Sequence, residues 1–110
     1  MVITPNYMEL SAPDLAASRS FYEQALGFSF TDYGDAYAAV EGGPVEIGLA
    51  AGTEPAAPLP TFETDDLERA HGTVIAAGGR ITREPFSFPG GRRFQFLDPG
   101  GNELAIYQPD

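Results

Sequence analysis

The sequence predicts an α+β fold built from two tandem modules, each a strand followed by a helix and three further strands. Two landmarks recur at the same offset of 52 residues, since Asp14-Leu15 returns as Asp66-Leu67 and Gly27 returns as Gly79. A repeat of this length indicates two copies of one supersecondary unit. With 110 residues, 43% of them hydrophobic, the chain is expected to form a single domain.

The first module is expected to cover about residues 1–50. Apolar residues between Asp14 and Leu26 recur at spacings of three and four, which is typical of an amphipathic helix. Ser11 or Asp14 can cap its first turn, and Gly27 can end it. The expected elements are a strand over Thr4–Leu10, a helix over Asp14–Leu26, and strands over Phe28–Tyr33, Ala36–Glu41 and Val45–Ala50. Glycine-containing turns separate the last three strands, which predicts a meander.

A linker over residues 51–58, containing two prolines, precedes the second module over about residues 59–110. Asp65-Asp66 predicts the start of a helix, and Gly78-Gly79 its end. The expected elements are a strand over Leu59–Thr64, a helix to about Ala77, and strands over Arg80–Phe86, Arg92–Leu97 and Glu103–Gln108.

Composition excludes several classes of function. The chain has no cysteine and one histidine, so disulfides, thiol nucleophiles, cysteine-based metal sites and multi-histidine cages are excluded. The net charge of −10 opposes binding to nucleic acid and to anionic membranes. No apolar run approaches the length of a membrane span and no leader is recognisable, so a soluble, cytoplasmic protein is expected.

Two motifs resemble the signatures of a known family. Asp14-Leu15, Ser20-Phe21-Tyr22 and Leu26-Gly27-Phe28 resemble the first-helix signature of the vicinal oxygen chelate superfamily, and residues 96–102 resemble its Asp-Pro-x-Gly-Asn turn. That superfamily includes glyoxalase I, extradiol dioxygenases and the bleomycin resistance proteins. The resemblance covers nearly the whole chain and implies two β-α-β-β-β modules with curved mixed sheets around a cleft.

The resemblance also implies where a metal ion would be held, on the first and last strands of each module. Carried over to this chain, those positions fall on Tyr7, Leu59, Ala105, and Glu46 or Gly48. Leucine and alanine have no donor atom, and a neutral tyrosine is a poor ligand. We therefore expect neither a metal nor another cofactor.

Strand alternation predicts which side chains would line the cleft. Met8, Leu10, Val45, Ile47, Leu49, Phe62, Leu104 and Ile106 are expected on the helix-covered faces. The opposite faces then carry the candidate ligand-binding residues, which are Tyr7, Glu9, Glu46, Leu59, Thr61, Glu63, Glu103, Ala105 and Tyr107. The alternative for each glutamate is an ordinary solvated position on a strand.

Other candidate residues have simpler interpretations. His71 lies in the second expected helix and is interpreted as an exposed or partly buried helix residue. Arg92-Arg93 could hold an anionic substrate, but the preceding glycines favour a solvated turn. The facing of Phe86, Phe88 and Phe94 is left open.

The leading functional prediction is a metal-independent protein that binds and sequesters a small molecule. Carboxylates beside tyrosines favour a cationic or neutral aromatic ligand. The alternative is an enzyme of the same superfamily (a lyase, isomerase or dioxygenase) with an atypical glutamate-based metal site, or a metal-free acid/base catalyst using Glu9, Glu46, Glu63 and Glu103. A structural or regulatory partner domain is the third interpretation. A homodimer is expected, since so short a chain leaves sheet edges exposed.

Overall fold

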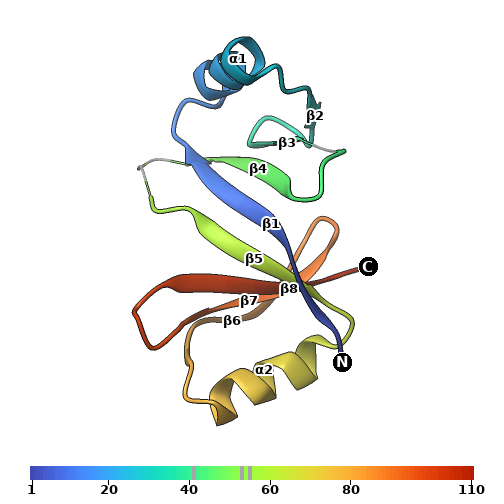
Figure 1. The fold of residues 1–110 in the computed structure, drawn as a ribbon, viewed down its shortest axis with the longest axis vertical. Helices are drawn as coiled ribbons and strands as arrows, with labels where there is room; N and C mark the ends of the chain where they lie inside the picture. Colours follow the sequence, from blue (N-terminus) through green and yellow to red (C-terminus); the bar gives the residue numbers. More distant parts are fainter. Residues whose placement is uncertain (41, 53, 55) are drawn as a thin grey trace. The chain divides into compact units, whose positions relative to one another are not determined.

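The computed structural model describes residues 1–40, 42–52, 54 and 56–110. The chain divides into a first unit, Tyr7–Pro58, and a second unit that joins Met1–Asn6 to Leu59–Asp110 (Figure 1). The elements follow the order β-α-β-β-β twice. This order confirms the predicted α+β fold of two β-α-β-β-β modules.

The described residues of the first unit form four strands and one helix. Its strand order is β2-β3-β4-β1, with β1 parallel to β4 and the other neighbours antiparallel. The elements are β1 (Ile3–Ala12, in this unit from Tyr7), α1 (Leu15–Leu26), β2 (Phe30–Asp32), β3 (Tyr37–Val40) and β4 (Glu46–Ala51). Asp14 caps α1 by accepting a hydrogen bond from the Ala17 backbone N–H at 3.1 Å. Gly27, at φ 70°, ends the helix in the left-handed conformation that glycine adopts without strain.

The second unit repeats this arrangement. Its strand order is β5-β8-β7-β6, with β5 parallel to β8. The elements are β5 (Leu59–Thr64), α2 (Leu67–Ala76), β6 (Arg80–Phe88), β7 (Gly91–Leu97) and β8 (Glu103–Pro109). Asp66 caps α2 as Asp14 caps α1, accepting from the Arg69 backbone N–H at 3.1 Å.

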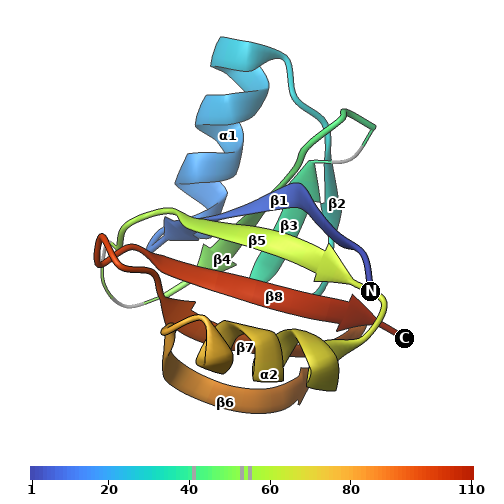
Figure 2. The same cartoon turned by 60° about the horizontal axis from the view of Figure 1, so that its bottom comes forward.

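Helix α2 covers one face of the second unit's strands, as Figure 2 shows. Leu67 and Ala70 of the helix form a buried cluster with Phe94 of β7 and Ile106 of β8. Phe62, Val74, Ile81 and Phe96 pack around this cluster. The predicted inward facing of Phe62 and Ile106 is confirmed, so the alternate residues of these strands point to the face opposite α2.

The structure corrects the sequence prediction at several points. Val45 was expected on a buried strand face but is 48% exposed, because β4 begins only at Glu46. Arg92 and Arg93 do not lie in a turn, because β7 begins at Gly91. The predicted strand end at Glu41 and residues 53 and 55 of the predicted linker lie outside the described residues. No helix in the described part of the chain is long and apolar enough to cross a membrane.

Candidate functional site

The face of the second unit opposite α2 carries a row of large polar and aromatic side chains. The strand register places Glu63 beside Tyr107, Tyr107 beside Arg93, and Arg93 beside Phe86. This row therefore crosses all four strands, from β5 through β8 and β7 to β6. Of the four, sequence analysis had assigned only Glu63 and Tyr107 to the site.

A second row on the same face is built from smaller side chains. Thr61 of β5 pairs with Ala105 of β8, which pairs with Gln95 of β7. Thr61 is 4% exposed and Ala105 fully buried. The Thr61 hydroxyl donates to the Leu59 carbonyl oxygen at 3.0 Å, so the polar atom of this buried residue is satisfied within its own strand.

Hydrogen bonds connect the polar side chains of this face. Glu103 Oε2 accepts from Thr82 Oγ1 at 2.7 Å and from Gln95 Nε2 at 3.0 Å. The other end of the Gln95 amide, Oε1, accepts from Arg93 at 3.3 Å. Gln95 thus bridges a carboxylate and a guanidinium, which fixes the orientation of its amide.

The Tyr107 hydroxyl lies at the other end of this face. It is 3.2 Å from Glu63 Oε1 and 3.3 Å from Asn6 Oδ1, and it can donate its proton to either. Asn6 belongs to the part of β1 that is grouped with the second unit. A phenol beside a carboxylate can pass a proton or hold a polar group of a ligand.

Two guanidinium groups lie against aromatic rings. Arg83 Cζ is 3.6 Å from the centroid of the Phe86 ring, within the range of a cation–π contact. Arg93 Cζ is 5.3 Å from the Phe86 centroid and 6.0 Å from the Phe88 centroid. Sequence analysis missed this arginine–phenylalanine cluster, although the inward facing of Phe94 would have predicted the outward facing of Arg93.

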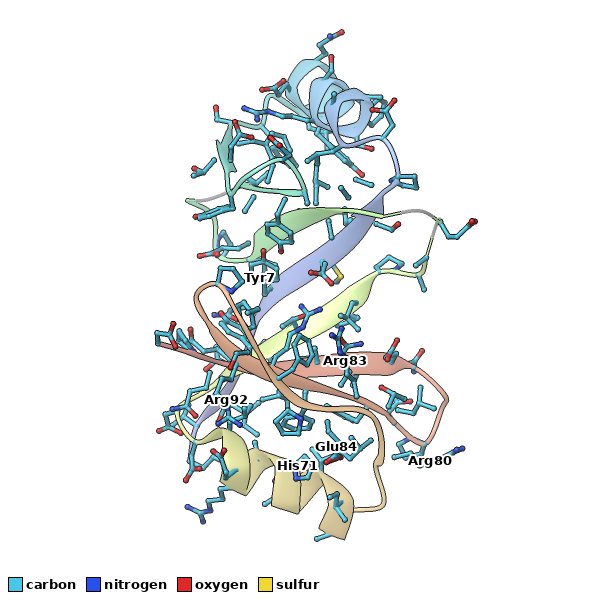
Figure 3. All side chains as sticks on the ribbon, turned by 180° about the vertical axis from the view of Figure 1, so that it is seen from behind. Tyr7, His71, Arg80, Arg83, Glu84 and Arg92 are labelled. Atoms are coloured by element: carbon cyan, nitrogen blue, oxygen red, sulfur yellow. The ribbon has the colours of Figure 1, made fainter. Side chains whose placement is uncertain are left out.

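Arg92 lies on the opposite side of the same strand. Its guanidinium pairs with Glu68 of α2 at 2.7 Å, and this hydrogen bond lowers the pKa of Glu68. Both side chains are largely exposed, so the pair contributes little to stability. Figure 3 labels Arg83 and Arg92, which come from neighbouring strands of the second unit.

The first unit holds a separate cluster of two tyrosines over a glycine. The hydroxyls of Tyr7 on β1 and Tyr37 on β3 are hydrogen-bonded to each other. Gly48 lies on β4, between these strands and in register with Glu9. A Cβ atom at Gly48 would overlap both hydroxyls. The sequence had indicated Tyr7, Glu9 and Gly48 here, but not the facing of Tyr37.

The residues at the positions where the resemblance implies metal ligands do not fit a divalent cation. Leu59 and Ala105 supply no donor atom, and Tyr7 is held by a second tyrosine hydroxyl. Glu46, in register with Tyr7, is exposed. Among the described residues, no group of three His, Cys, Asp or Glu side chains could hold a metal ion.

His71 has a packing role. Its ring meets the Phe94 ring edge to face, with centroids 5.1 Å apart, and its Nε2 lies 3.4 Å from Glu84 Oε1. The side chain is 22% exposed, as expected for a partly buried helix residue. Figure 3 shows His71 and Glu84 next to each other.

The predicted site residues are thus divided between the two units. Thr61, Glu63, Glu103, Ala105 and Tyr107 lie on strands β5 and β8 of the second unit, as does Leu59. Tyr7, Glu9 and Glu46 lie on β1 and β4 of the first unit. Arg83, Phe86, Arg93 and Gln95 join the second-unit group, and Tyr37 joins the first.

Comparison with known proteins gives one family and several relatives. Residues 4–106 match the model of the Glyoxalase/Bleomycin resistance protein/Dioxygenase superfamily. An uncharacterized protein of Mycolicibacterium smegmatis is 36% identical over 105 residues, covering 91% of this chain and 89% of its own. The putative glyoxylase CFP32 of Mycobacterium bovis is 30% identical over 94% of this chain, and the anthracycline biosynthesis protein DauV of a Streptomyces species is 27% identical over 93%. This chain spans only 42% and 40% of the length of the last two.

Solved structures share the fold at low sequence identity. A protein described as a benzaldehyde dehydrogenase from Legionella pneumophila aligns with a TM-score of 0.80 and 20% identity over 96% of this chain and 100% of its own. Methylmalonyl-CoA epimerase from Mycobacterium tuberculosis aligns with a TM-score of 0.74 and 17% identity, over 96% of this chain and 87% of its own. Homoprotocatechuate 2,3-dioxygenase from Arthrobacter globiformis aligns with a TM-score of 0.75 and 22% identity, over 98% of this chain and 36% of its own. These likenesses concern the fold, which hosts several chemistries.

Proposed function

Because the chain belongs to the Glyoxalase/Bleomycin resistance protein/Dioxygenase superfamily, we propose that it binds a small aromatic molecule without a metal ion. The observation that carries this proposal is the pair Leu59 and Ala105, which have no donor atoms and occupy two positions to which the resemblance assigns metal ligands. The Tyr107 hydroxyl and the aromatic residues of β6 provide instead the few polar and stacking contacts that a binding protein needs.

The proposed ligand is cationic or neutral rather than anionic. The net charge of −10 raises the local concentration of cations around the chain, and Glu63 and Glu103 place carboxylates on the second unit's face. A relative named for anthracycline biosynthesis supports a polycyclic aromatic ligand as the first class to test.

Three aromatic probes test the charge preference. Daunorubicin carries a cationic amino sugar, its aglycone daunomycinone is neutral, and anthraquinone-2-carboxylate is anionic. We expect calorimetry to give the highest affinity for the cationic probe, a lower one for the neutral probe and the lowest for the anionic probe. Added salt should lower the affinity for the cationic probe. Tighter binding of the carboxylate, or no salt dependence for daunorubicin, would contradict the charge preference.

The Glu63→Gln variant tests one carboxylate directly. It removes the negative charge beside Tyr107. If the ligand contacts this residue, the affinity for daunorubicin should fall roughly tenfold, whereas the affinity for the neutral aglycone should change little. Glu84→Gln is the matched control, since Glu84 is exposed and contacts His71. Equal effects of the two substitutions would assign Glu63 to the solvated surface.

Metal content tests the other half of the proposal. Protein purified without chelator should contain far less than one equivalent of zinc, nickel, manganese or iron, measured by mass spectrometry. Adding each ion should leave the affinity for the aromatic probe unchanged. Stoichiometric metal, or binding that depends on it, would overturn the proposal.

One observation favours acid/base catalysis as a second candidate function. The Tyr107 hydroxyl lies 3.2 Å from Glu63 Oε1, which would let the carboxylate and the phenol share a proton during a reaction. Incubation of the metal-free protein with simple ketones in deuterated water, followed by NMR, measures proton exchange beside the carbonyl. Exchange above the buffer rate that is lost in both Glu63→Gln and Tyr107→Phe would support this alternative.

A further inference from the structure

The strand registers show which residue of β4 corresponds to Ala105 of β8. In the second unit, Ala105 pairs with the β5 residue that lies two positions after Leu59. In the first unit, Gly48 pairs with the β1 residue that lies two positions after Tyr7. Because Tyr7 and Leu59 are separated by the repeat offset of 52 residues, Gly48 is the counterpart of Ala105. This equivalence places the implied ligand position of β4 at Gly48 rather than at Glu46.

Gly48 is buried on an internal strand of the first unit. Its register neighbours are Glu9 on β1 and Ala39 on β3, and Ala39 is 3% exposed. Tyr7 and Tyr37 each precede one of these neighbours by two residues, so they point to the same face of the strands. A glycine beside an alanine leaves space above this face, and the two partly buried tyrosines reach into that space from opposite sides.

The two tyrosine hydroxyls meet directly over Gly48. They are hydrogen-bonded to each other, and both lie closer to the place of a Gly48 Cβ atom than non-bonded atoms can approach. The ring carbon that bears the Tyr37 hydroxyl also lies within this range. A side chain at Gly48 would therefore begin in space that the tyrosines already fill. A metal ligand at this position is excluded by packing, whichever donor atom it carries.

We infer that Tyr37 keeps the first unit from holding a metal ion, because it fills the space over Gly48 into which a ligand would project. This inference rests on the proposed function and extends its metal-free half. Leu59, Ala105 and Gly48 supply no side-chain donor, and in the first unit the packing would exclude a donor even if one were introduced. Tyr37 lies on β3, outside the positions that the resemblance implies, so the sequence gives no sign of this role.

Donors restored to the first unit test this inference. Tyr7→His combined with Gly48→His places two imidazoles as diagonal neighbours on β1 and β4, within reach of one ion. Calorimetry on untagged protein measures nickel binding. With Tyr37 in place, this two-histidine variant should bind nickel no more tightly than the native chain. With Tyr37→Ala added, the nickel affinity should rise roughly tenfold or more, because both imidazoles can then turn toward a shared ion.

Tyr33→Ala is the matched control for Tyr37→Ala. Tyr33 is 56% exposed, and its ring meets the Tyr37 ring edge to face with centroids 6.4 Å apart. The atoms nearest to a Gly48 Cβ, however, belong to Tyr7 and Tyr37. In the two-histidine variant, Tyr33→Ala removes a ring of the same kind and should leave the nickel affinity unchanged. Circular dichroism establishes that each variant is folded.

A second readout uses the native chain and does not depend on a variant that folds. Nuclear Overhauser effects should connect the Gly48 Hα protons with the ring protons of both Tyr7 and Tyr37. Absence of these effects, tight nickel binding by the two-histidine variant with Tyr37 intact, or equal nickel affinity with and without Tyr37→Ala overturns the inference. Each of these results leaves the metal-free binding of aromatic molecules intact. Stoichiometric metal in the native protein overturns the proposed function together with the inference.

Discussion

Gly48 illustrates how a single missing side chain determines the local geometry of the first unit. Its Cα lies on β4 beneath the hydrogen-bonded hydroxyls of Tyr7 and Tyr37, and a Cβ atom there would overlap both oxygens. We expect Gly48→Ala to separate the tyrosines and to lower the free energy of unfolding by about 1–3 kcal/mol, as overpacking does elsewhere. Chemical denaturation measures the change.

Gly43→Ala is the matched control for this substitution. Among the described residues its new Cβ would meet only the Val45 carbonyl oxygen, at an ordinary 3.5 Å, so its effect should stay within about 0.5 kcal/mol. Tyr37→Phe in the Gly48→Ala background removes one of the two overlapping hydroxyls and should recover part of the loss. Equal stability of Gly48→Ala and native protein would show that the tyrosines move aside at no cost.

At the scale of elements, the turn between β7 and β8 is held by one carboxylate. Asp98 accepts from the Asn102 side chain at 3.0 and 3.3 Å and from the Asn102 backbone N–H at 2.8 Å. The hydrogen bonds from the Asn102 side chain have the largest effect, followed by the one from its backbone. They favour the ionised carboxylate and therefore lower the pKa of Asp98 below its ordinary 3.8. The turn is therefore stabilised most when Asp98 is charged.

This pKa shift predicts the direction of a pH dependence. Because the pKa of Asp98 is lower in the folded state, its contribution to stability is complete above about pH 4 and is lost as the pH falls through the folded-state pKa. In Asn102→Ala, NMR titration should give an Asp98 pKa closer to 3.8, and the loss of stability on acidification should be smaller. An Asp98 pKa at or above 3.8 in the native protein would contradict this account.

The elements that sequence analysis predicted well are those with local signals. Asp14 and Asp66 mark both helix starts by accepting from the backbone N–H three residues later. Both helices and all eight strands lie where the capping residues and the turn residues between them predicted, and the errors are confined to the ends of these elements. β7 begins at Gly91, one residue before the predicted start at Arg92, because strand pairing with Phe88 and Pro109 draws the glycine into the sheet.

The site was less predictable because its signals are not local. Alternation within a strand predicted that Glu63 and Tyr107 share a face, and the register of β5 with β8 places them side by side. The same alternation could not align β6 with β7, because the pairing contains two register shifts between Ile81 and Phe86. Those irregularities decide which residues of β6 meet Arg93, and nothing in the sequence marks them.

At the scale of the whole molecule, the expected homodimer remains a proposal, and exposed apolar side chains now give it a surface to test. Phe21 and Leu26 of α1 are 62% and 57% exposed, and no residue of that helix is buried. Contact with a second copy would remove this apolar surface from water, at roughly 25 cal/mol per Å². We expect light scattering at tens of micromolar protein to give about twice 11.7 kDa.

Two substitutions connect the assembly to that helix. Phe21→Ser combined with Leu26→Ser should shift the mass toward that of one chain, because it removes the apolar area that a second copy would cover. Ile75→Ser is the control, since Ile75 is 50% exposed on α2 and should leave the mass unchanged. A native mass near 11.7 kDa at this concentration would refute the dimer, whereas a dimer that survives the double substitution would place the interface away from α1. Because a net charge of −10 on each copy opposes association, added salt should favour the dimer. This effect is opposite in sign to the expected effect of salt on daunorubicin binding, which it should weaken.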